Sequence, residues 1–184
     1  MTAAIMLLRG VNVVGRNKIK MDELKSLGES IGLRDVRTYI QSGNVVFQSD
    51  QRTMAGCAKR MEMAIEKECG FRPMVTVRTV GEVRKIIANN PFAGRPNLIH
   101  AKLLVSFLER KPTPKQRESA RMIATGPEEV HILGREMHIY YANGVGLSKL
   151  PIGRIEKALG TSGTARNWNT VTRLLEMAQD VERG

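Results

Sequence analysis

The order in which strand and helix signals alternate along the chain limits its fold more than any other feature. Apolar residues run unbroken over residues 3–8, and residues 21–31 show the three- and four-residue spacing of an amphipathic helix. A hairpin pattern follows at 36–48, a second helical pattern at 52–69 and a further strand pattern at 74–78. This order of strand, helix, strand, strand, helix, strand is typical of the ferredoxin-like, or split βαβ, arrangement.

The same signals begin again after residues 89–97, a stretch rich in Asn, Pro and Gly that has the composition of a linker. The predicted elements are a strand, a helix, a hairpin and a helix, at residues 100–108, 113–124, 130–141 and 152–159. No strand pattern follows, and a Gly-, Ser- and Thr-rich segment leads into a last amphipathic helix instead. We therefore predict an α+β chain with two ferredoxin-like subdomains, at residues 1–90 and 91–184, the second modified and ending in a C-terminal helix.

Each residue of the first predicted sheet can be assigned to one of two faces, because side chains alternate along a strand. One face of such a sheet is buried under its helices, and the other is commonly solvated. The face under the helices should carry Ile40, Val45, Phe47, Val75 and Val77. The opposite face, which we expect to be open, should carry Arg37, Tyr39, Gln41, Gln48, Thr76 and Arg78.

The segment from Arg9 to Lys20, which we call the basic loop, contains four basic residues and no acidic one. Together with a formal net charge of +11, the loop favours a phosphate-bearing partner such as nucleic acid. It also has the glycine spacing of a P-loop, but Arg16 and Asn17 stand where P-loop chemistry needs Lys and Ser or Thr. We therefore do not predict a nucleoside triphosphatase. Looser phosphate contact and a merely solvated basic loop are the two alternatives.

Two further segments carry groups that suit an anionic ligand. Gln41 lies beside a predicted hairpin tip, Ser42-Gly43-Asn44, whose own composition is explained by turn chemistry. Arg166 follows a Gly-, Ser- and Thr-rich turn before the last helix, where an anion can bind, although anchoring of that helix explains it equally well. The candidate ligand-binding residues are Arg9, Asn12, Arg16, Lys18, Lys20, Gln41 and Arg166.

Other site chemistries find less support in the sequence. An RNA-recognition motif stacks bases on aromatic residues of its central strands, and residues 3–8 contain none. His131 and His138 should lie opposite each other across the second hairpin, with His100 in the preceding strand. Apart from Glu129 and Glu136, whose facing the sequence leaves open, no carboxylate or cysteine is placed to complete a zinc shell. We predict neither a metal site nor a cofactor, and no nucleophile–base pair or close carboxylate pair identifies a catalytic residue.

The two cysteines and the N-terminus indicate the compartment. Cys57 and Cys69 fall in one predicted helix, about 18 Å apart at 1.5 Å per residue, too far for a disulfide. Free thiols are typical of a reducing compartment. The apolar run at residues 3–8 is too short for a signal peptide, and no stretch approaches the length of a membrane span. We expect a cytoplasmic protein without a membrane partner.

Four motifs in order carry a family resemblance. They are Leu7-Leu8-Arg9-Gly10-Val11-Asn12-Val13, Asn17-Lys18-Ile19-Lys20-Met21, Tyr39-Ile40-Gln41-Ser42-Gly43-Asn44-Val45-Val46-Phe47 and Arg166-Asn167-Trp168-Asn169-Thr170-Val171. This set resembles the bacterial family called domain of unknown function 1697. The family usually has Gly-Gly-Lys where this chain has Val14-Gly15-Arg16, so a larger residue replaces one glycine. The resemblance implies a cytosolic bacterial protein with ferredoxin-like subdomains, and it brings no assigned activity.

The function we expect is the binding of a phosphate-bearing ligand, either nucleic acid or a nucleotide, through the basic loop. Two alternatives stay open at this stage. One is an enzyme that acts on a small anionic metabolite in a cleft between the subdomains, and the other is a scaffold for protein interactions. The sequence does not determine the oligomeric state.

Overall fold

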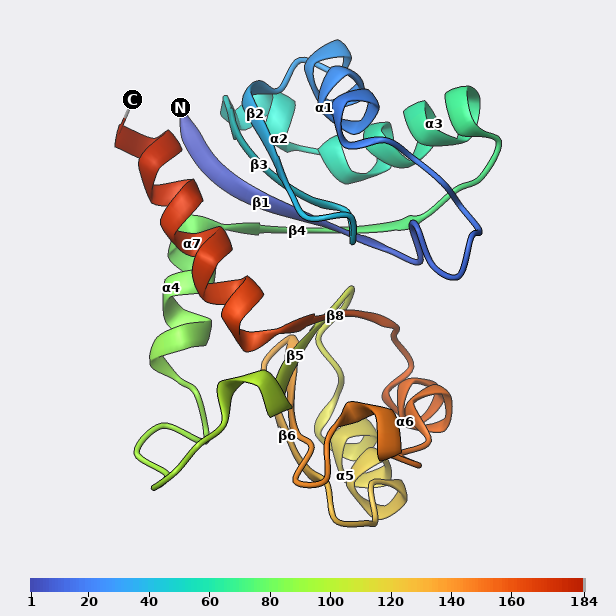
Figure 1. Cartoon of the computed structure of the whole chain (residues 1–184), viewed down its shortest axis with the longest axis vertical. Helices are drawn as coiled ribbons and strands as arrows, with labels where there is room; N and C mark the ends of the chain where they lie inside the picture. Colours follow the sequence, from blue (N-terminus) through green and yellow to red (C-terminus); the bar gives the residue numbers. More distant parts are fainter. Residues whose placement is uncertain (184) are drawn as a thin grey trace. The chain divides into compact units, whose positions relative to one another are not determined.

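The computed structural model describes residues 1–183, and their contacts group the chain into two compact units (Figure 1). Unit 1 comprises Met1–Lys85 together with the chain from Thr172 onward, and unit 2 comprises Ile86–Val171. Each unit contains one four-stranded sheet. The predicted α+β class with two ferredoxin-like subdomains is confirmed. The domain limits 1–90 and 91–184 stay a prediction, because contacts do not show which parts fold independently.

Unit 1 contains the predicted order of strand, helix, strand, strand, helix, strand, in an antiparallel sheet ordered β2-β3-β1-β4. Its elements are β1 (Thr2–Arg9), α1 (Met21–Ser30), β2 (Arg34–Tyr39), β3 (Asn44–Ser49), α2 (Gln51–Met54), α3 (Cys57–Cys69) and β4 (Met74–Thr79). Helices α4 (Val80–Ala88) and α7 (Trp168–Arg183) each contribute residues to both units. The single helix predicted at 52–69 is wrong, because Gly56 adopts a left-handed φ of 72° and separates α2 from α3.

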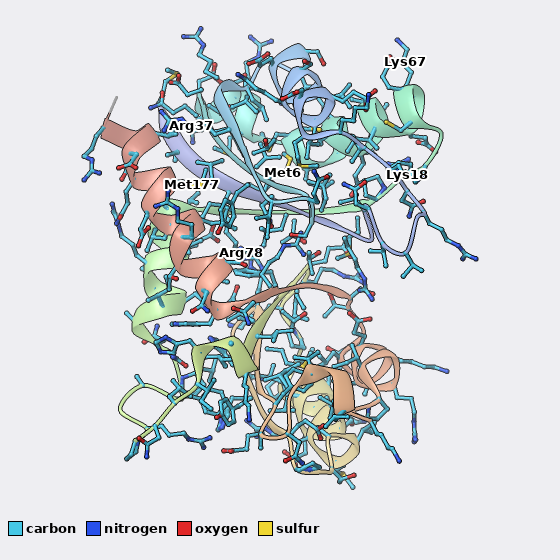
Figure 2. The ribbon with its side chains drawn as sticks, viewed as in Figure 1. Met6, Lys18, Arg37, Lys67, Arg78 and Met177 are labelled. Carbon is cyan, nitrogen blue, oxygen red and sulfur yellow. The ribbon has the colours of Figure 1, made fainter. Side chains whose placement is uncertain are left out.

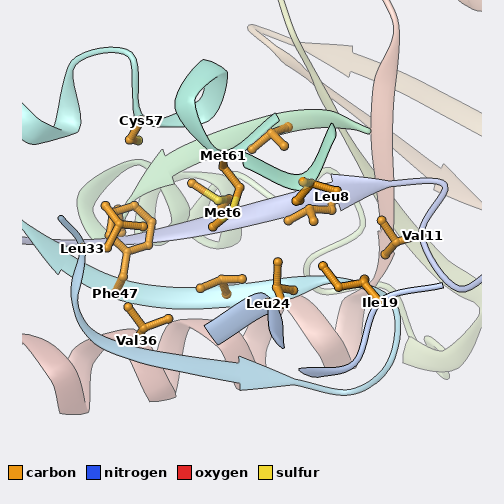
Figure 3. Close-up of a cluster of buried hydrophobic side chains, with 14 residues drawn as sticks. Met6, Leu8, Val11, Ile19, Leu24, Leu33, Val36, Phe47, Cys57 and Met61 are labelled. Carbon is orange, nitrogen blue, oxygen red and sulfur yellow. The ribbon is translucent and has the colours of Figure 1, made fainter. Parts of the chain in front are cut away.

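Helices α1 and α3 pack on one face of this sheet, which we call the helix face (Figure 3). Leu24 of α1 and Met61 of α3 are fully buried in one core cluster with Met6 and Phe47 of the sheet. Burial of each such side chain stabilises the fold by about 1.5–3 kcal/mol. This cluster confirms the predicted helix-face residues Val45, Phe47, Val75 and Val77.

Ile40 was predicted for the helix face, and this prediction is wrong. The residue lies past the end of β2, in the turn before β3, with 49% of its surface exposed. Its φ of 49° takes the chain out of the extended conformation, so the period-two alternation stops one residue earlier than the sequence indicated.

The opposite face of the unit 1 sheet is not open as expected. Gln48, Thr76 and Arg78 have the predicted facing, but they are 8%, 4% and 2% exposed. Part of the cover is α7, since the side-chain amide of Gln48 donates a hydrogen bond to the carbonyl of Val181. Arg37, at the β2 edge, stays exposed. A helix more than a hundred residues away in sequence therefore covers a face that local patterning assigns to solvent.

Unit 2 repeats the strand order of unit 1, as β6-β7-β5-β8. Its elements are η1 (His100–Lys102), β5 (Leu103–Leu108), α5 (Pro114–Ile123), β6 (Glu129–Leu133), β7 (Glu136–Tyr140), η2 (Val145–Leu147), α6 (Ile152–Leu159) and β8 (Gly163–Asn167). Strand β8 occupies the place where we expected no strand, and it pairs with β5. Its small and polar residues lack the apolar alternation of a strand, so pairing with β5 rather than propensity decides its conformation.

The predicted linker at residues 89–97 is in part an ordered piece of unit 2. Phe92 is 2% exposed, and its ring meets that of His131 edge-on at 5.1 Å between centroids. The guanidinium of Arg95 lies 5.0 Å from the ring centres of both Phe92 and Tyr140, and it donates to the carboxylate of Glu129 at 2.7 Å. This segment packs on the β6–β7 hairpin instead of only connecting two parts. Among the described residues, no helix is both long and apolar enough to cross a membrane.

Candidate functional site

The basic loop joins β1 to α1 in unit 1 and is fixed in the core on both sides of its tip. Val11 and Ile19 are each 3% exposed and belong to the unit 1 core cluster (Figure 3). The exposed cations Arg16 and Lys18 lie between these two anchors. Only a short stretch of loop is therefore free to move, and its charges are carried on a well-defined frame.

Two asparagines hold the loop together from inside. The side-chain amide of Asn12 donates to the carbonyls of Ile19 at 3.0 Å and Gln41 at 2.9 Å, and its oxygen accepts from the Ile19 N–H at 2.9 Å. Asn17 donates from its side chain to the Gly10 carbonyl at 2.8 Å. Both side-chain donors of Asn12 are thus engaged by backbone, which leaves it one acceptor site. Its role as a ligand-binding residue stays a prediction, and its role as an internal brace is observed.

The tip of the loop is a tight turn from Val13 to Arg16. The Arg16 N–H donates to the Val13 carbonyl at 2.9 Å, and the two central residues, Val14 and Gly15, have φ values of 47° and 76°. Positive φ at both central positions is the signature of a type I′ turn. Gly15 suits this geometry, whereas a β-branched residue such as Val14 is strained by it. Val14 is also 94% exposed, so no packing compensates the strain.

The turn between β2 and β3 meets the basic loop at the same end of the sheet. Besides the bond from Asn12 to the Gln41 carbonyl, the Leu8 N–H donates to the Gly43 carbonyl at 2.9 Å. Gly43 has a φ of 77° and lies so close to Val11 that a Cβ atom there would be 2.5 Å from a Val11 methyl group. The exposed side chain of Gln41 is thereby held beside the loop, although Gln41 is in a turn and not in the predicted strand.

A hollow of about 790 Å³, which we call the loop pocket, lies between the basic loop, the β2–β3 turn and the start of α1. Its lining residues are Asn12, Gly15, Lys18, Ile19, Lys20, Met21, Asp22, Glu23 and Gln41. Four predicted site residues, Asn12, Lys18, Lys20 and Gln41, therefore lie around one hollow. The volume is in the range of pockets that bind one small ligand.

The charges around the loop pocket have few partners within the protein. In the part of the chain that the structure describes, Arg16, Lys18 and Lys20 form no ion pair, and Figure 2 labels Lys18 on the basic loop. By contrast, Arg72 of the same unit is paired with Glu62 and Glu66, at 3.3 Å in both cases. Arg16, Lys18 and Lys20 are thus available to a ligand.

Sequence reasoning did not select five of the pocket residues. Gly15 and Ile19 belong to the basic loop itself, and Met21, Asp22 and Glu23 form the first turn of α1. One oxygen of Glu23 accepts from the Lys20 N–H at 3.2 Å, which satisfies a backbone donor at the helix start. The signal that points to these residues is their position: a predicted helix that begins directly after a candidate loop brings its first turn to the same site.

The remaining three candidate residues, Arg16, Arg9 and Arg166, do not line the loop pocket. Arg16 closes the turn at the loop tip. Arg9 ends β1 opposite Met74, and alternation places its side chain on the same side as Ile5 and Leu7, away from the helix face. Arg166 belongs to β8 of unit 2, opposite Val105, and not to a turn before the last helix. Its side chain is 9% exposed, and burial lowers its pKa to about 10.

The histidines of unit 2 lie partly as predicted. His131 and His138 are directly opposite in the β6–β7 pair. His138 is 1% exposed with both ring nitrogens unpartnered among the described residues, and burial, then the charge of His131, lowers its pKa to about 4. His100 instead lies 6.5 Å from the Trp168 ring, between centroids. Within residues 1–183, no three His, Cys, Asp or Glu side chains are grouped as metal ligands.

Comparisons with known proteins identify relatives but no activity. A family model described as "Protein of unknown function (DUF1697)" matches residues 1–138, which include three of the four sequence motifs. No curated protein matches the chain. A solved structure, that of conserved bacterial protein SP0830 from Streptococcus pneumoniae, is similar with a TM-score of 0.74 and 22% identity, over 97% of this chain and 99% of that one. At this identity the similarity concerns the fold alone.

Proposed function

We propose that this chain, which belongs to the DUF1697 family, binds a phosphate-bearing ligand, nucleic acid or nucleotide, through the basic loop. The description of the family assigns no activity, so the function is inferred from the chain's own site. In this proposal Arg16, Lys18 and Lys20 contact phosphate groups, and Gln41 contacts another part of the ligand. Arg9, which is partly exposed, extends the basic surface of unit 1, whereas Arg166 is buried in unit 2 and takes no part in this proposal.

The observation that carries the proposal is that three exposed cations without ion pairs lie on an anchored loop. Side chains that form no internal ion pair bind an anion without first breaking one. The anchoring of Val11 and Ile19 reduces the entropy lost when a ligand orders the loop. Contacts from Lys and Arg to phosphates are largely independent of sequence and weaken as salt rises, since binding releases counterions.

Salt-dependent titration tests this proposal. We expect a labelled single-stranded oligonucleotide to bind at about 50 mM salt, and the Arg16→Gln/Lys18→Gln/Lys20→Gln variant to weaken binding about tenfold or more. The slope of log Kd against log salt should fall by about 2, because each lost phosphate contact on a single strand accounts for about 0.7. Fluorescence anisotropy measures both quantities.

A matched variant controls for net charge. Arg52→Gln/Lys59→Gln/Lys67→Gln removes one Arg and two Lys from exposed positions of the same unit, and within residues 1–183 no ion pair involves them. Figure 2 shows Lys67 at the end of α3, away from the basic loop. This control should retain most of the affinity. Absence of any binding at low salt, or an equal loss in both triple variants, would contradict the proposal.

The proposal also places the protein in the cytoplasm. Cys57 and Cys69 are free thiols in the structure, which agrees with a reducing cytoplasm, where nucleic acids and nucleotides are abundant.

A further inference from the structure

We propose that the loop pocket recognises the ribose of its ligand through Asp22, so that the protein prefers ribonucleotide over deoxyribonucleotide units. This inference rests on the proposed function and specifies its ligand class. Lys18 and Lys20 bind the phosphate, and the carboxylate of Asp22 accepts a hydrogen bond from a ribose hydroxyl.

The charge composition of the pocket is the first argument. Two lysines and two carboxylates line the same hollow. A carboxylate weakens a site for phosphate alone, because like charges a few ångströms apart repel. Mixed lining instead suits a ligand that presents a hydrogen-bond donor next to its negative group. A nucleotide does so, since the ribose hydroxyls adjoin the phosphate ester.

Asp22 is the carboxylate that is available for this contact. Glu23 already accepts from the backbone N–H of Lys20 and caps α1. Asp22 is exposed, and within residues 1–183 it forms no ion pair and no hydrogen bond through its carboxylate. A carboxylate has about four acceptor positions, all of which a ligand can use here. Interaction with the helix dipole accounts for an acidic residue in this turn, but it does not require two.

The remaining lining of the pocket agrees with sugar rather than base recognition. Its volume of about 790 Å³ accommodates one nucleotide unit. No aromatic residue lines it, so a base has no ring on which to stack. Gln41 offers one amide to a base edge, which is too little for strong sequence preference. The 2′-hydroxyl is then the main feature by which this site distinguishes one nucleic acid from another.

Oligouridylate and oligodeoxyuridylate of equal length test the inference, because they share base and charge and differ only in the 2′-hydroxyl. Fluorescence anisotropy at about 50 mM salt should show a preference for the ribo-oligomer of about three- to tenfold, the effect of one hydrogen bond. In Asp22→Ala the preference should fall below about twofold. The same variant should bind the deoxy-oligomer at least as tightly as wild type, since a negative charge has been removed.

Two controls separate this contact from general effects. Glu68→Ala removes an exposed carboxylate of α3 that does not line the pocket, and it should keep the ribo preference. In competition, uridine 5′-monophosphate should displace the oligomer at lower concentration than 2′-deoxyuridine 5′-monophosphate.

The outcomes distinguish this inference from the proposed function. If both oligomers bind equally and the triple cation variant weakens both, phosphate binding stands and ribose recognition is wrong. If Asp22→Ala weakens both oligomers alike, Asp22 supports the loop structurally and the inference is overturned. If neither oligomer binds, the proposed function fails before the inference is reached.

Discussion

Single residues in the two turns beside the loop pocket adopt conformations that are unfavourable for their type. Val14 and Ile40 are both β-branched, both exposed, and have φ values of 47° and 49°. Val14 gains no burial in return and Ile40 is only half-buried. Hydrogen bonds close both turns, from the Arg16 N–H to the Val13 carbonyl and from the Asn44 side-chain amide to the Tyr39 carbonyl. Such strain is found in proteins mainly near functional sites, which agrees with a ligand site at this end of the sheet.

Replacing Val14 by glycine should therefore stabilise the protein. A left-handed conformation costs a non-glycine residue about 1–2 kcal/mol, and the added freedom of glycine in the unfolded chain cancels part of this gain. We expect Val14→Gly to raise the free energy of unfolding in urea by about 1 kcal/mol. Val13→Gly, at the neighbouring exposed position without positive φ, should lower it instead. A loss of stability in Val14→Gly would show that the valine makes a favourable contact.

At the scale of elements, the basic loop and the β2–β3 turn form one unit of structure. Asn12 bonds to the backbone of both, and Gly43 lies against Leu8 and Val11. The position of the cations relative to Gln41 therefore depends on the close approach of two segments that are thirty residues apart in sequence. Only glycine allows this approach, because its φ is positive and a Cβ atom would overlap Val11.

Alanine at two glycines should have opposite effects. Gly43→Ala forces a Cβ atom to 2.5 Å from the Val11 methyl group and 2.9 Å from the Leu8 Cβ, so we expect a loss of about 2 kcal/mol or more in unfolding free energy. Gly81→Ala, in α4 with nothing within 4 Å and an ordinary φ, should gain about 0.5 kcal/mol from helix propensity. Chemical denaturation compares the two; a neutral Gly43→Ala would mean that the turn and loop move apart easily.

At the scale of the whole molecule, the two units repeat one design down to single positions. Thr76 and Arg78 on β4 lie opposite Leu7 and Ile5 of β1, and Thr164 and Arg166 on β8 lie opposite the corresponding residues of β5. All four side chains are buried on the face of the sheet opposite the helices, which are α1 and α3 in unit 1 and α5 and α6 in unit 2. Neither threonine hydroxyl has a hydrogen-bond partner among the described residues. The repeat therefore includes buried polar groups as well as strand order.

His138 adds a titratable group to this buried face of unit 2, and stability should depend on pH through it. Above its ordinary pKa of 6.5 the imidazole is neutral in both folded and unfolded states. Between pH 6.5 and the folded-state pKa of about 4, only the unfolded chain binds the proton, so stability should fall as pH falls, by up to about 1.4 kcal/mol per pH unit.

Denaturation at neutral and mildly acidic pH measures this effect. His138→Leu should show a shallower loss of stability on acidification than wild type, because the group that titrates in the unfolded chain has been removed. His100→Gln, at an exposed histidine, should keep the wild-type dependence. Equal dependence in wild type and His138→Leu would mean that His138 is protonated within the fold.

Local sequence patterns were sufficient for the parts of the fold that short segments decide. Apolar periodicity identifies α1, α5 and the hairpins. A helix that buries one stripe, or a strand that buries one face, must repeat apolar residues at the spacing of that element. The same reasoning placed His131 opposite His138. Charge alone indicated the basic loop, and the structure adds that three of its cations, Arg16, Lys18 and Lys20, form no ion pair within residues 1–183.

Where local sequence signals are weak or absent, only the tertiary structure determined the conformation and burial of a segment. Strand β8 exists because β5 offers it an edge, and α7 covers a sheet face that period two assigned to solvent. For the basic loop, sequence determined its charge and its glycine content. Its shape depends on the contacts of Asn12 and Gly43 with a distant turn, and the loop pocket depends on the first turn of α1. These contacts join residues that are far apart along the chain. The interactions that stabilise the shape of the loop therefore cannot be read from any short stretch of sequence.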